Sequence, residues 1–379
     1  MEYTKIKDIN EYISESVVPM DTPQQIFEMY SVPVYGTGHP EYLHGNEIAS
    51  NKIRVKKNDV LLCKINPRIN RVWIVADESE YPCIASSEWI VIRNSEYNPE
   101  FLAWYFRNPK FKQLMTSEVT GIGGSLTRAQ PKAVAEYPVP ILDRREQDYI
   151  TDILNKVNNI VNARMQEIQK LDELIKARFV EMFGDPEINT KGYQKEPLQK
   201  HADVLVGYPF KSEGYTEGGV RIVGGYNLMQ GFIIWEDCKY WPDTDGFEQY
   251  LLKDGDIVMA MDRPWVNGGF KIASVDKEHL PALLIQRTAC IRGKDVEQEF
   301  LYSLLNSHWF ADHCNITGSL VPHISNKDIN SYEIVLPPIE EQKAYAEFVR
   351  QVDKSKVAVQ KLLDETKVLF DALMQKYFG

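Results

Sequence analysis

The sequence has few cysteines and no long apolar segment, and both absences limit what the protein can be. Its 5 cysteines among 379 residues are scattered, and none forms a C-x-x-C pair. This pattern argues against a disulfide framework and against a zinc site. No run of about 18 apolar residues is present, so no membrane span is expected. The first residues, Met1–Lys5, lack the basic start and apolar run of a signal peptide. The sequence therefore predicts a cytoplasmic protein with reduced thiols.

Catalytic motifs are missing as well. There is no G-x-G-x-x-G after a strand and no P-loop G-x-x-x-x-G-K-[ST]. The [DNS]-P-P-[YFW] tetrapeptide of an amino-methyltransferase site is also lacking, and Leu336–Ile339 does not fit it. His308, His313 and Cys314 lie close in sequence, but no matching set of ligands recurs elsewhere. We therefore predict no catalytic residue, no metal and no cofactor on this chain.

The net charge of −11 argues mildly against nucleic-acid binding by the chain as a whole. Residues 1–142 hold 15 basic and 17 acidic side chains, whereas residues 185–339 hold 14 and 22. Contact with DNA depends on local fields rather than on the total charge. One basic stretch lies in the first segment and consists of Lys52, Arg54, Lys56, Lys57, Lys64, Arg68 and Arg71. A solvated strand and loop is the alternative explanation for each of these residues.

One unit is written twice in the chain, at a period of about 195 residues. The matching segments are Tyr137–Ile141 with Glu146-Gln147 and Tyr332–Ile339 with Glu341-Gln342, then Asn58–Pro67 and Gly255–Pro264, then Gly124–Leu126 and Gly318–Leu320, and finally Met182–Gly184 and Tyr377–Gly379. Solenoid repeats are only 20–50 residues long, so this period implies two whole domains.

Each copy is expected to be rich in strands. The predicted strands include Val60–Leu62 and Trp89–Ile92 in the first copy, and Asp256–Met259 and Thr288–Ile291 in the second. Pro99–Met115 and Glu299–Phe310 are mostly apolar, and each is predicted to be one short, buried helix. The glycine-rich segment Thr120–Ser125 could hold a phosphate through its N–H groups, although a plain connector explains it equally well.

A long amphipathic helix follows each copy, at about 144–183 and 340–377. Apolar residues in heptad spacing form the predicted seam: Leu154, Val157, Val161, Ile168, Leu171 and Ile175 in the first helix, and Val349, Val352, Val359, Leu363, Phe370 and Leu373 in the second. A lone helix of this length would be marginally stable, so we expect the two seams to pack together, antiparallel. The alternative is that each helix lies on its own domain.

The predicted fold is of the α+β class. Two domains of mixed, strand-rich fold are joined by two long helices, and these helices form an antiparallel coiled coil. The predicted segments are a first domain at 1–142, a central helix at 143–185, a second domain at 186–339 and a distal helix at 340–379.

This organisation resembles the specificity (S) subunit of type I restriction-modification systems. Two domains alternate with two helices, and each helix is entered through a proline-rich strand and a Glu-Gln pair. Gly207–Ser212 and Leu252–Val258 are also similar to the target-recognition domains of that family, and Lys176–Asp185 is similar to its helix exit. The resemblance covers essentially the whole chain. Each motif is common alone, but their order and duplication are specific.

The resemblance implies that each target-recognition domain reads one half of a bipartite sequence in double-stranded DNA. The helix pair would set the gap and dock two modification (M) methyltransferase subunits. Those subunits would bind S-adenosylmethionine and methylate adenine N6. Restriction (R) subunits would add ATP-dependent translocation and cleavage. The chain itself would carry no chemistry, and no membrane partner is implied.

The DNA-binding residues are predicted from side-chain chemistry, because Arg and Lys suit guanine while Asn and Gln suit adenine. The candidates for base contact are Lys64, Asn66, Arg68, Asn70 and Arg71 in the first domain, and Arg263, Trp265, Asn267, Lys211 and Asn227 in the second. The candidates for phosphate contact, beside the glycine loops, are Ser125, Thr127, Arg128, Ser319 and His323. Two other functions stay open: a coiled-coil scaffold with two protein-binding domains, and a stand-alone methyltransferase or nuclease.

Overall fold

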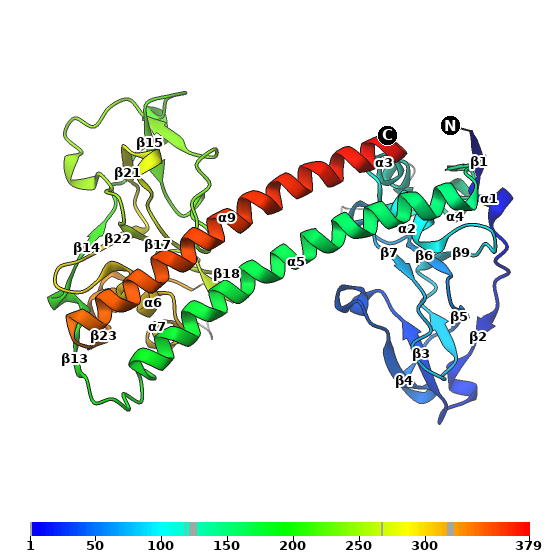
Figure 1. The fold of residues 1–379 in the computed structure, drawn as a ribbon, viewed down its shortest axis with the longest axis horizontal. Coiled ribbons are helices and arrows are strands. Elements are labelled where there is room, and N and C mark those ends of the chain that lie inside the picture. The colour runs from blue at the N-terminus through cyan, green and yellow to red at the C-terminus, as the bar shows by residue number, and fades with distance from the viewer. Residues whose placement is uncertain (1, 118, 121–126, 267, 317–321) are drawn as a thin grey trace. The chain divides into compact units, whose positions relative to one another are not determined.

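The computed structural model describes residues 2–117, 119–120, 127–266, 268–316 and 322–379. The chain divides into two compact units (Figure 1): unit 1 comprises Met1–Met165 and Lys361–Gly379, and unit 2 comprises Gln166–Gln360. Each unit contains one globular part and a section of both long helices. The domain boundaries that the sequence suggests remain a prediction. Within the described ranges, no helix is long and apolar enough to cross a membrane.

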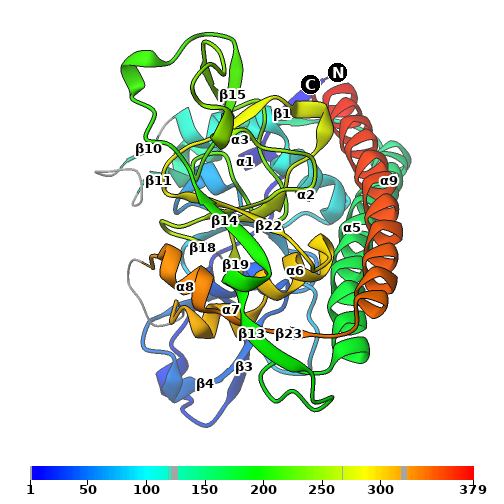
Figure 2. The same ribbon diagram turned by 90° about the vertical axis from the view of Figure 1, so that its left-hand side faces the viewer.

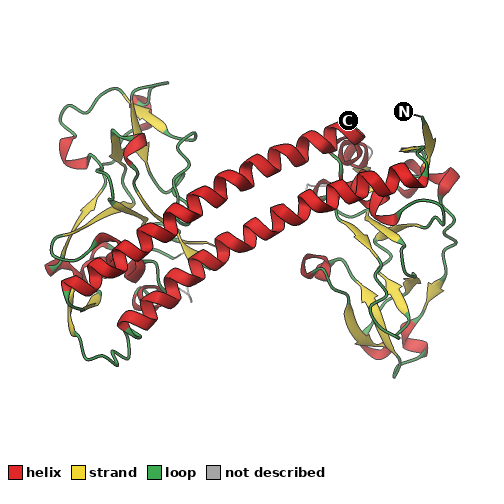
Figure 3. Ribbon diagram, in the orientation of Figure 1, coloured by secondary structure: helices red, strands yellow, loops and turns green. Residues whose placement is uncertain are grey.

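Unit 1 is built on two small sheets, whose strands are yellow in Figure 3. The five-stranded sheet has the order β2 (Ser16–Val17), β5 (Lys52–Arg54), β8 (Cys83–Ala85), β3 (Ile26–Tyr30) and β4 (Glu41–His44). The three-stranded sheet has the order β7 (Val72–Ile74), β6 (Val60–Cys63) and β9 (Trp89–Ile92). The short pairs are β1 (Tyr3–Lys5) with β12 (Pro138–Pro140), and β10 (Val119–Thr120) with β11 (Arg128–Ala129). Two prolines fit in β12 because it pairs only with β1 in this sheet.

Four α-helices complete the globular part of unit 1 as the structure describes it: α1 (Ile6–Ile9), α2 (Pro99–Arg107), α3 (Pro109–Ser117) and α4 (Pro131–Val134). The prediction of a single helix over Pro99–Met115 is therefore wrong. The chain breaks at Asn108, whose backbone is extended, because a proline disfavours helical geometry at the preceding residue. Asn98 starts α2 by accepting hydrogen bonds from the N–H groups of Glu100 and Phe101, at 2.8 and 3.3 Å.

Unit 2 has the same plan with longer loops. Its four-stranded sheet has the order β14 (Ala202–Val206), β22 (Thr288–Gly293), β17 (Ile257–Ala260) and β20 (Ile272–Ser274). Its three-stranded sheet has the order β16 (Lys239–Trp241), β15 (Val220–Val223) and β21 (Ala282–Leu284). The short pairs are β13 (Gln194–Pro197) with β23 (Glu333–Leu336), and β18 (Trp265–Val266) with β19 (Gly269–Phe270).

The helices of this globular part are α6 (Gln298–Leu305), α7 (His308–His313) and α8 (Asn326–Ser331). The predicted helix Glu299–Phe310 is also wrong as a single element, since it is divided between α6 and α7. Ser307 begins α7 by accepting a hydrogen bond from the N–H of Phe310. The 3₁₀ turns of both units are η1 (Pro19–Asp21), η2 (Pro33–Thr37), η3 (Gly45–Glu47), η4 (Pro67–Ile69), η5 (Leu198–Lys200), η6 (Ser212–Gly214), η7 (Glu248–Tyr250) and η8 (Lys277–His279).

The strand pairings bear out the internal duplication. The antiparallel arrangement β7-β6-β9 in unit 1 corresponds to β20-β17-β22 in unit 2. The parallel pair β3–β8 likewise corresponds to β15–β21. In each unit the first strand pairs with the strand that leads into a long helix, namely β1 with β12 and β13 with β23. The two copies therefore share their connectivity as well as their motifs.

The two long helices, α5 (Arg144–Phe183) and α9 (Ile339–Phe378), have 40 residues each. In unit 1, Leu154 of α5 is fully buried in a cluster that contains Met374 and Phe378 of α9. In unit 2, the rings of Phe179 and Tyr345 lie 5.6 Å apart. The first half of α5 thus meets the second half of α9, and the second half of α5 meets the first half of α9. The helices are antiparallel, and the predicted fold class is confirmed.

The predicted seam residues are all buried or partly buried. Each helix also packs on the domain that it follows, as in the hydrogen bonds of Trp104 with Asn155 of α5 and of Ser303 with Tyr345 of α9, both at 2.8 Å. The two packing modes that the sequence left as alternatives therefore occur together. The pairwise contacts along the whole seam stay a prediction.

Candidate functional site

Three segments of unit 1 meet at the end of strand β6, and we call this place the first corner. It consists of Lys64–Asn66, Glu88 and Thr127–Ala129. The N–H of Lys64 donates to the carbonyl of Glu88 at 3.0 Å, and the N–H of Asn66 donates to the carbonyl of Thr127 at 2.8 Å. The N–H of Ala129 donates back to the carbonyl of Lys64 at 2.9 Å. Backbone hydrogen bonds therefore hold the three segments of the corner together.

Unit 2 has a second corner with the same backbone bonds, made of Met261–Arg263, Arg287 and Pro322–Ile324. The N–H of Met261 donates to the carbonyl of Arg287 at 2.9 Å, and that of Arg263 donates to Pro322 at 3.1 Å. The N–H of Ile324 donates to Met261 at 2.8 Å. The corner leads directly into α8, which lies on the opposite side of unit 2 from α9 (Figure 2).

The two corners share an unusual backbone geometry. Asn66 has φ = 48° and its counterpart Arg263 has φ = 46°, and a proline follows each of them. Left-handed backbone is tolerated by asparagine but disfavoured for most other side chains. The turn leaves Arg68 and Arg263 exposed. The loops therefore present basic side chains to solvent from a rigid strand end.

A partly buried ion pair links the two strands of each corner at the end away from the corner, because Asp59 and Asp256 precede β6 and β17 while Arg93 and Arg292 lie at the far ends of β9 and β22. Asp59 binds two nitrogens of Arg93, both at 2.7 Å, and accepts the N–H of Lys56 at 2.8 Å. Asp256 accepts hydrogen bonds from Nε and Nη2 of Arg292 at 2.7 and 2.6 Å, and from the N–H of Lys253 at 2.7 Å. These hydrogen bonds raise the pKa of both arginines. The pair joins the central strand of each corner to its neighbour, β6 to β9 and β17 to β22.

The repeated glutamines have a structural role that the sequence did not reveal. Gln147 accepts the N–H of Asn98 at 2.7 Å and donates to the carbonyl of Leu142 at 2.9 Å. Gln342 accepts the N–H of Glu297 at 3.0 Å and donates to the carbonyl of Pro337 at 2.8 Å. Each glutamine is buried and ties the start of a long helix to the start of a core helix. We call these contacts the glutamine clamps.

The structure brings several predicted DNA-binding residues together and separates others. Lys64, Asn66, Thr127 and Arg128 lie in the first corner, and Arg263 and His323 lie in the second. Arg68, Asn70 and Arg71 continue the first loop through η4, and Trp265 packs against Phe270 at 4.8 Å beside the second corner. Lys211 is exposed in a separate segment before η6. Ser125, Asn267 and Ser319 lie outside the described residues.

Asn227 is a correction to the predicted set. Its side chain is fully buried. Its amide oxygen accepts the N–H of Gly224 at 3.0 Å, and its amide nitrogen donates to Ile234 and Cys238, at 3.3 and 3.1 Å. The side chain closes a turn and is not placed to contact a base.

Sequence reasoning missed the charged residues that complete the corners. Arg128 pairs with Glu88 at 3.3 Å in the first corner. In the second corner, Asp262 binds both Arg287 and His323, at 3.0 and 2.6 Å. Glu88 and Arg287 each stand directly before a strand, β9 and β22. Their equivalent positions in the two copies were the sequence signal that could have identified Glu88 and Arg287.

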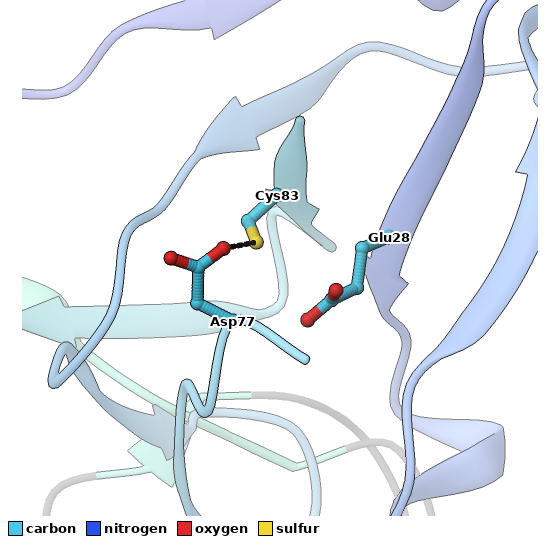
Figure 4. Close-up of side chains that lie close together, drawn as sticks. All are labelled: Glu28, Asp77 and Cys83. Carbon is cyan, nitrogen blue, oxygen red and sulfur yellow. Dashed lines mark hydrogen bonds between the residues drawn. The ribbon is translucent and has the colours of Figure 1, made fainter. Parts of the chain in front are cut away.

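One cluster away from the corners, with two buried residues and one exposed residue, contains the types of side chain that bind metals. Potential ligand atoms of Glu28, Asp77 and Cys83 lie within 4.8 Å of one another (Figure 4). The carboxylate of Glu28, however, already accepts four hydrogen bonds, from Tyr30, the N–H of Glu78 and both donors of Ser79, at 2.6–3.1 Å.

The pKa values in this cluster follow from these contacts. Burial alone would raise the pKa of Glu28, but the donors outweigh it and hold that pKa below its ordinary value. Burial raises the pKa of the Cys83 thiol, and the hydrogen bond to Asp77 raises it further. A protonated thiol is a poor metal ligand. The cluster therefore fits a structural role in holding the turn at residues 76–79.

Comparison with known proteins identifies the same family that the sequence motifs suggested. A model of the type I restriction modification DNA specificity domain matches residues 192–366. The MjaVIII specificity subunit of Methanocaldococcus jannaschii is 25% identical over 81% of this chain and 75% of its own length. The EcoAI specificity subunit of Escherichia coli is 36% identical, over 40% of this chain and 26% of its own length.

The fold has solved counterparts too. The S subunit of a type I restriction-modification system from M. genitalium has a TM-score of 0.60 at 12% identity, covering 100% of this chain and 96% of that one. At this identity the likeness concerns the fold alone, while the family model and the curated relatives carry the assignment. The family model and the curated relatives support a specificity subunit of a type I restriction-modification system, a family whose known role is DNA sequence recognition.

Proposed function

We propose that the chain reads a bipartite sequence in double-stranded DNA, with one half read at each corner. The observation that carries this proposal is the pair of corners, which have the same backbone hydrogen bonds but different side chains. A shared scaffold with different exposed residues suits two modules that recognise different half-sites. Sequence is read by hydrogen bonds to base edges, so the side chains at the corners would set the two half-sites.

The residues of the corners have the chemistry that base and phosphate contact requires. Arg68 and Arg263 are exposed and can donate to guanine, and Asn66 and Asn70 carry amides suited to adenine. Thr127 and His323 are candidates for phosphate contact. Each set lies on loops fixed by a sheet, as is usual for binding residues. Lys211 remains a candidate from a separate segment of unit 2.

The long helices would serve as the spacer between the half-sites and as the docking site for other subunits. A helix of 40 residues extends about 60 Å at roughly 1.5 Å per residue. Ile160 and Met165 of α5 and Val357 and Val368 of α9 are exposed apolar residues. Such residues on a helix suit a protein partner, and we propose two M subunits there, with R subunits joining the complex.

The chemistry would reside on those partners. We propose that S-adenosylmethionine binds to the M subunits and ATP to the R subunits, and that this chain binds no cofactor. Methylation of adenine needs the base to be flipped out of the duplex. The specificity subunit would hold the duplex in the cytoplasm while an M subunit takes the base.

The test is a map of N6-methyladenine in cells that express this chain with the M subunit of its own genome, against cells with the M subunit alone. We expect a new two-part motif with a fixed gap that disappears without this chain. Absence of a new motif from a soluble, co-purified complex would contradict DNA reading by this chain. Failure of the two proteins to co-purify would favour the protein-binding scaffold instead.

A further inference from the structure

The second corner carries a three-residue ionic cluster that faces solvent. One carboxylate oxygen of Asp262 lies 3.0 Å from Nη1 of Arg287, and the other lies 2.6 Å from Nδ1 of His323. The side chains of Arg287, His323 and Asp262 are 73%, 57% and 37% exposed. An exposed ion pair contributes little to folding, because water solvates both partners well. The cluster is therefore poorly explained as a stabilising element.

The first corner has different chemistry at the same positions. The matching backbone bonds make Glu88 the counterpart of Arg287, and Ile65 the counterpart of Asp262. At this position the second corner has a guanidinium that is 73% exposed, whereas the first has a carboxylate that is 29% exposed and paired with Arg128. The two corners therefore offer different hydrogen-bonding groups at one equivalent position.

Backbone strain also marks the second corner. The described part of the chain contains eight non-glycine residues with positive φ, and six of them are Asn or Asp. The other two are Arg263, at 46°, and Arg287, at 64°. Left-handed backbone is unfavourable for a long side chain and persists only where the surroundings enforce it. Two such arginines in one corner suggest that their placement serves binding.

We propose that Arg287 reads a guanine in the half-site of unit 2, and that Asp262 is the positioning residue that orients its guanidinium. This inference rests on the proposed DNA-reading function. Arginine binds O6 and N7 of guanine through two N–H donors, which is its commonest specific base contact. Asp262 engages Nη1, and the other nitrogens keep N–H donors for a base.

The carboxylate of Asp262 also distinguishes a base from a phosphate. A phosphate brought to Arg287 would lie beside this negative charge and would be repelled, whereas the neutral edge of guanine would not. The cluster therefore favours reading of a base at this position.

The test is selection of a randomised duplex library by the full chain in complex with the M subunit, using wild type, Arg287→Ala and Arg287→Lys. We expect Arg287→Ala to lose selectivity at one G·C pair by roughly 10- to 100-fold, with the other positions unchanged. Arg287→Lys should lose much of the same selectivity, because lysine keeps the charge but not the two-pronged geometry. Lys294→Ala is the matched control: Lys294 follows the opposite end of β22, pairs with Asp203 at 2.9 Å and should leave the motif unchanged.

Asp262 is tested in the same selection. Asp262→Asn should weaken the preference at the same G·C pair, while its thermal unfolding midpoint stays equal to that of the Lys294→Ala control. Asp262→Glu should restore part of the preference. An Arg287→Ala complex that folds normally and keeps the wild-type motif would overturn this inference but not the proposed function. A uniform loss of affinity for all sequences would overturn it in favour of a phosphate contact. A wild-type complex without any sequence preference would sink the proposed function as well.

Discussion

The glutamine clamp of unit 2 allows a quantitative prediction about stability. Gln342 is 3% exposed, and its amide satisfies the N–H of Glu297 and the carbonyl of Pro337. Glu297 is the first residue before α6 and makes no side-chain cap of its own. In Gln342→Ala both backbone groups lose their partner. Each unsatisfied buried group costs about 1–3 kcal/mol, so the loss of two partners should lower the free energy of unfolding of unit 2 by about 2–6 kcal/mol.

The assay is native-state hydrogen exchange, which reports unfolding region by region. Amides of α6 should exchange faster in Gln342→Ala, while those of α2 in unit 1 should be unaffected. Gln147→Ala should give the reverse pattern. Its effect should be smaller, because the side chain of Asn98 still caps α2. Gln351→Ala, at an exposed glutamine of the same helix, is the control. Exchange in α6 that is unchanged in Gln342→Ala would refute the clamp.

Three further predictions concern the spacer, one buried carboxylate and the ion pairs. Seven residues inserted after Met165 in α5 and after Gln360 in α9 keep the heptad and add about 10 Å. The gap of the methylation motif should grow by roughly three base pairs, and an unchanged gap would contradict the spacer role. Glu28→Gln should destabilise the protein at pH 7. Because the pKa of Glu28 is lowered in the fold, its contribution is present above the unfolded pKa of about 4.3 and lost as pH falls. Urea unfolding should therefore show the difference from wild type shrinking below pH 4; a constant difference would exclude this origin. Arg292→Ala leaves Asp256 buried without its partner and should lower the free energy of unfolding by about 3–5 kcal/mol, measured by the same method. A decrease of less than about 1 kcal/mol in the free energy of unfolding would show that the ion pair of Asp256 and Arg292 does not stabilise the fold.

The long helices could be predicted from the sequence because their signals are local. Heptad spacing, the stop at Gly184 and the repeated Glu-Gln entry define both helices within a residue or two of their observed ends. Their antiparallel packing follows from the need to cover two apolar seams. A short helix gives a weaker signal. Apolar residues on both sides hid the break at Asn108, which the following proline could have indicated.

The corners could be predicted only in part because they depend on contacts distant in sequence. The loop after β6 was found from its charge and its place in the repeat. Arg128 was predicted from its place beside the glycine loop, but its pairing with Glu88 depends on how strands distant in sequence come together, and only the internal repeat could have indicated Glu88. The prediction that Asn227 contacts a base was wrong, because an asparagine near a turn suits DNA contact as well as it suits the turn. Only the burial of its side chain decides between these two roles.

The acidic balance of the second domain does not oppose DNA recognition there. The ion pairs of Asp59 and Asp256 and the glutamine clamps have the same structural role in both copies. They add little net charge to the surface. On the proposed function, recognition depends on the field at the corner, where Arg287 and His323 both contact the carboxylate of Asp262 and Arg263 is exposed beside it. If the partner subunits neutralise most of the phosphate charge, the second domain needs only this small donor surface. A duplicated scaffold could then change its base preference by exchanging three or four exposed side chains, because backbone hydrogen bonds hold the segments of the corner together.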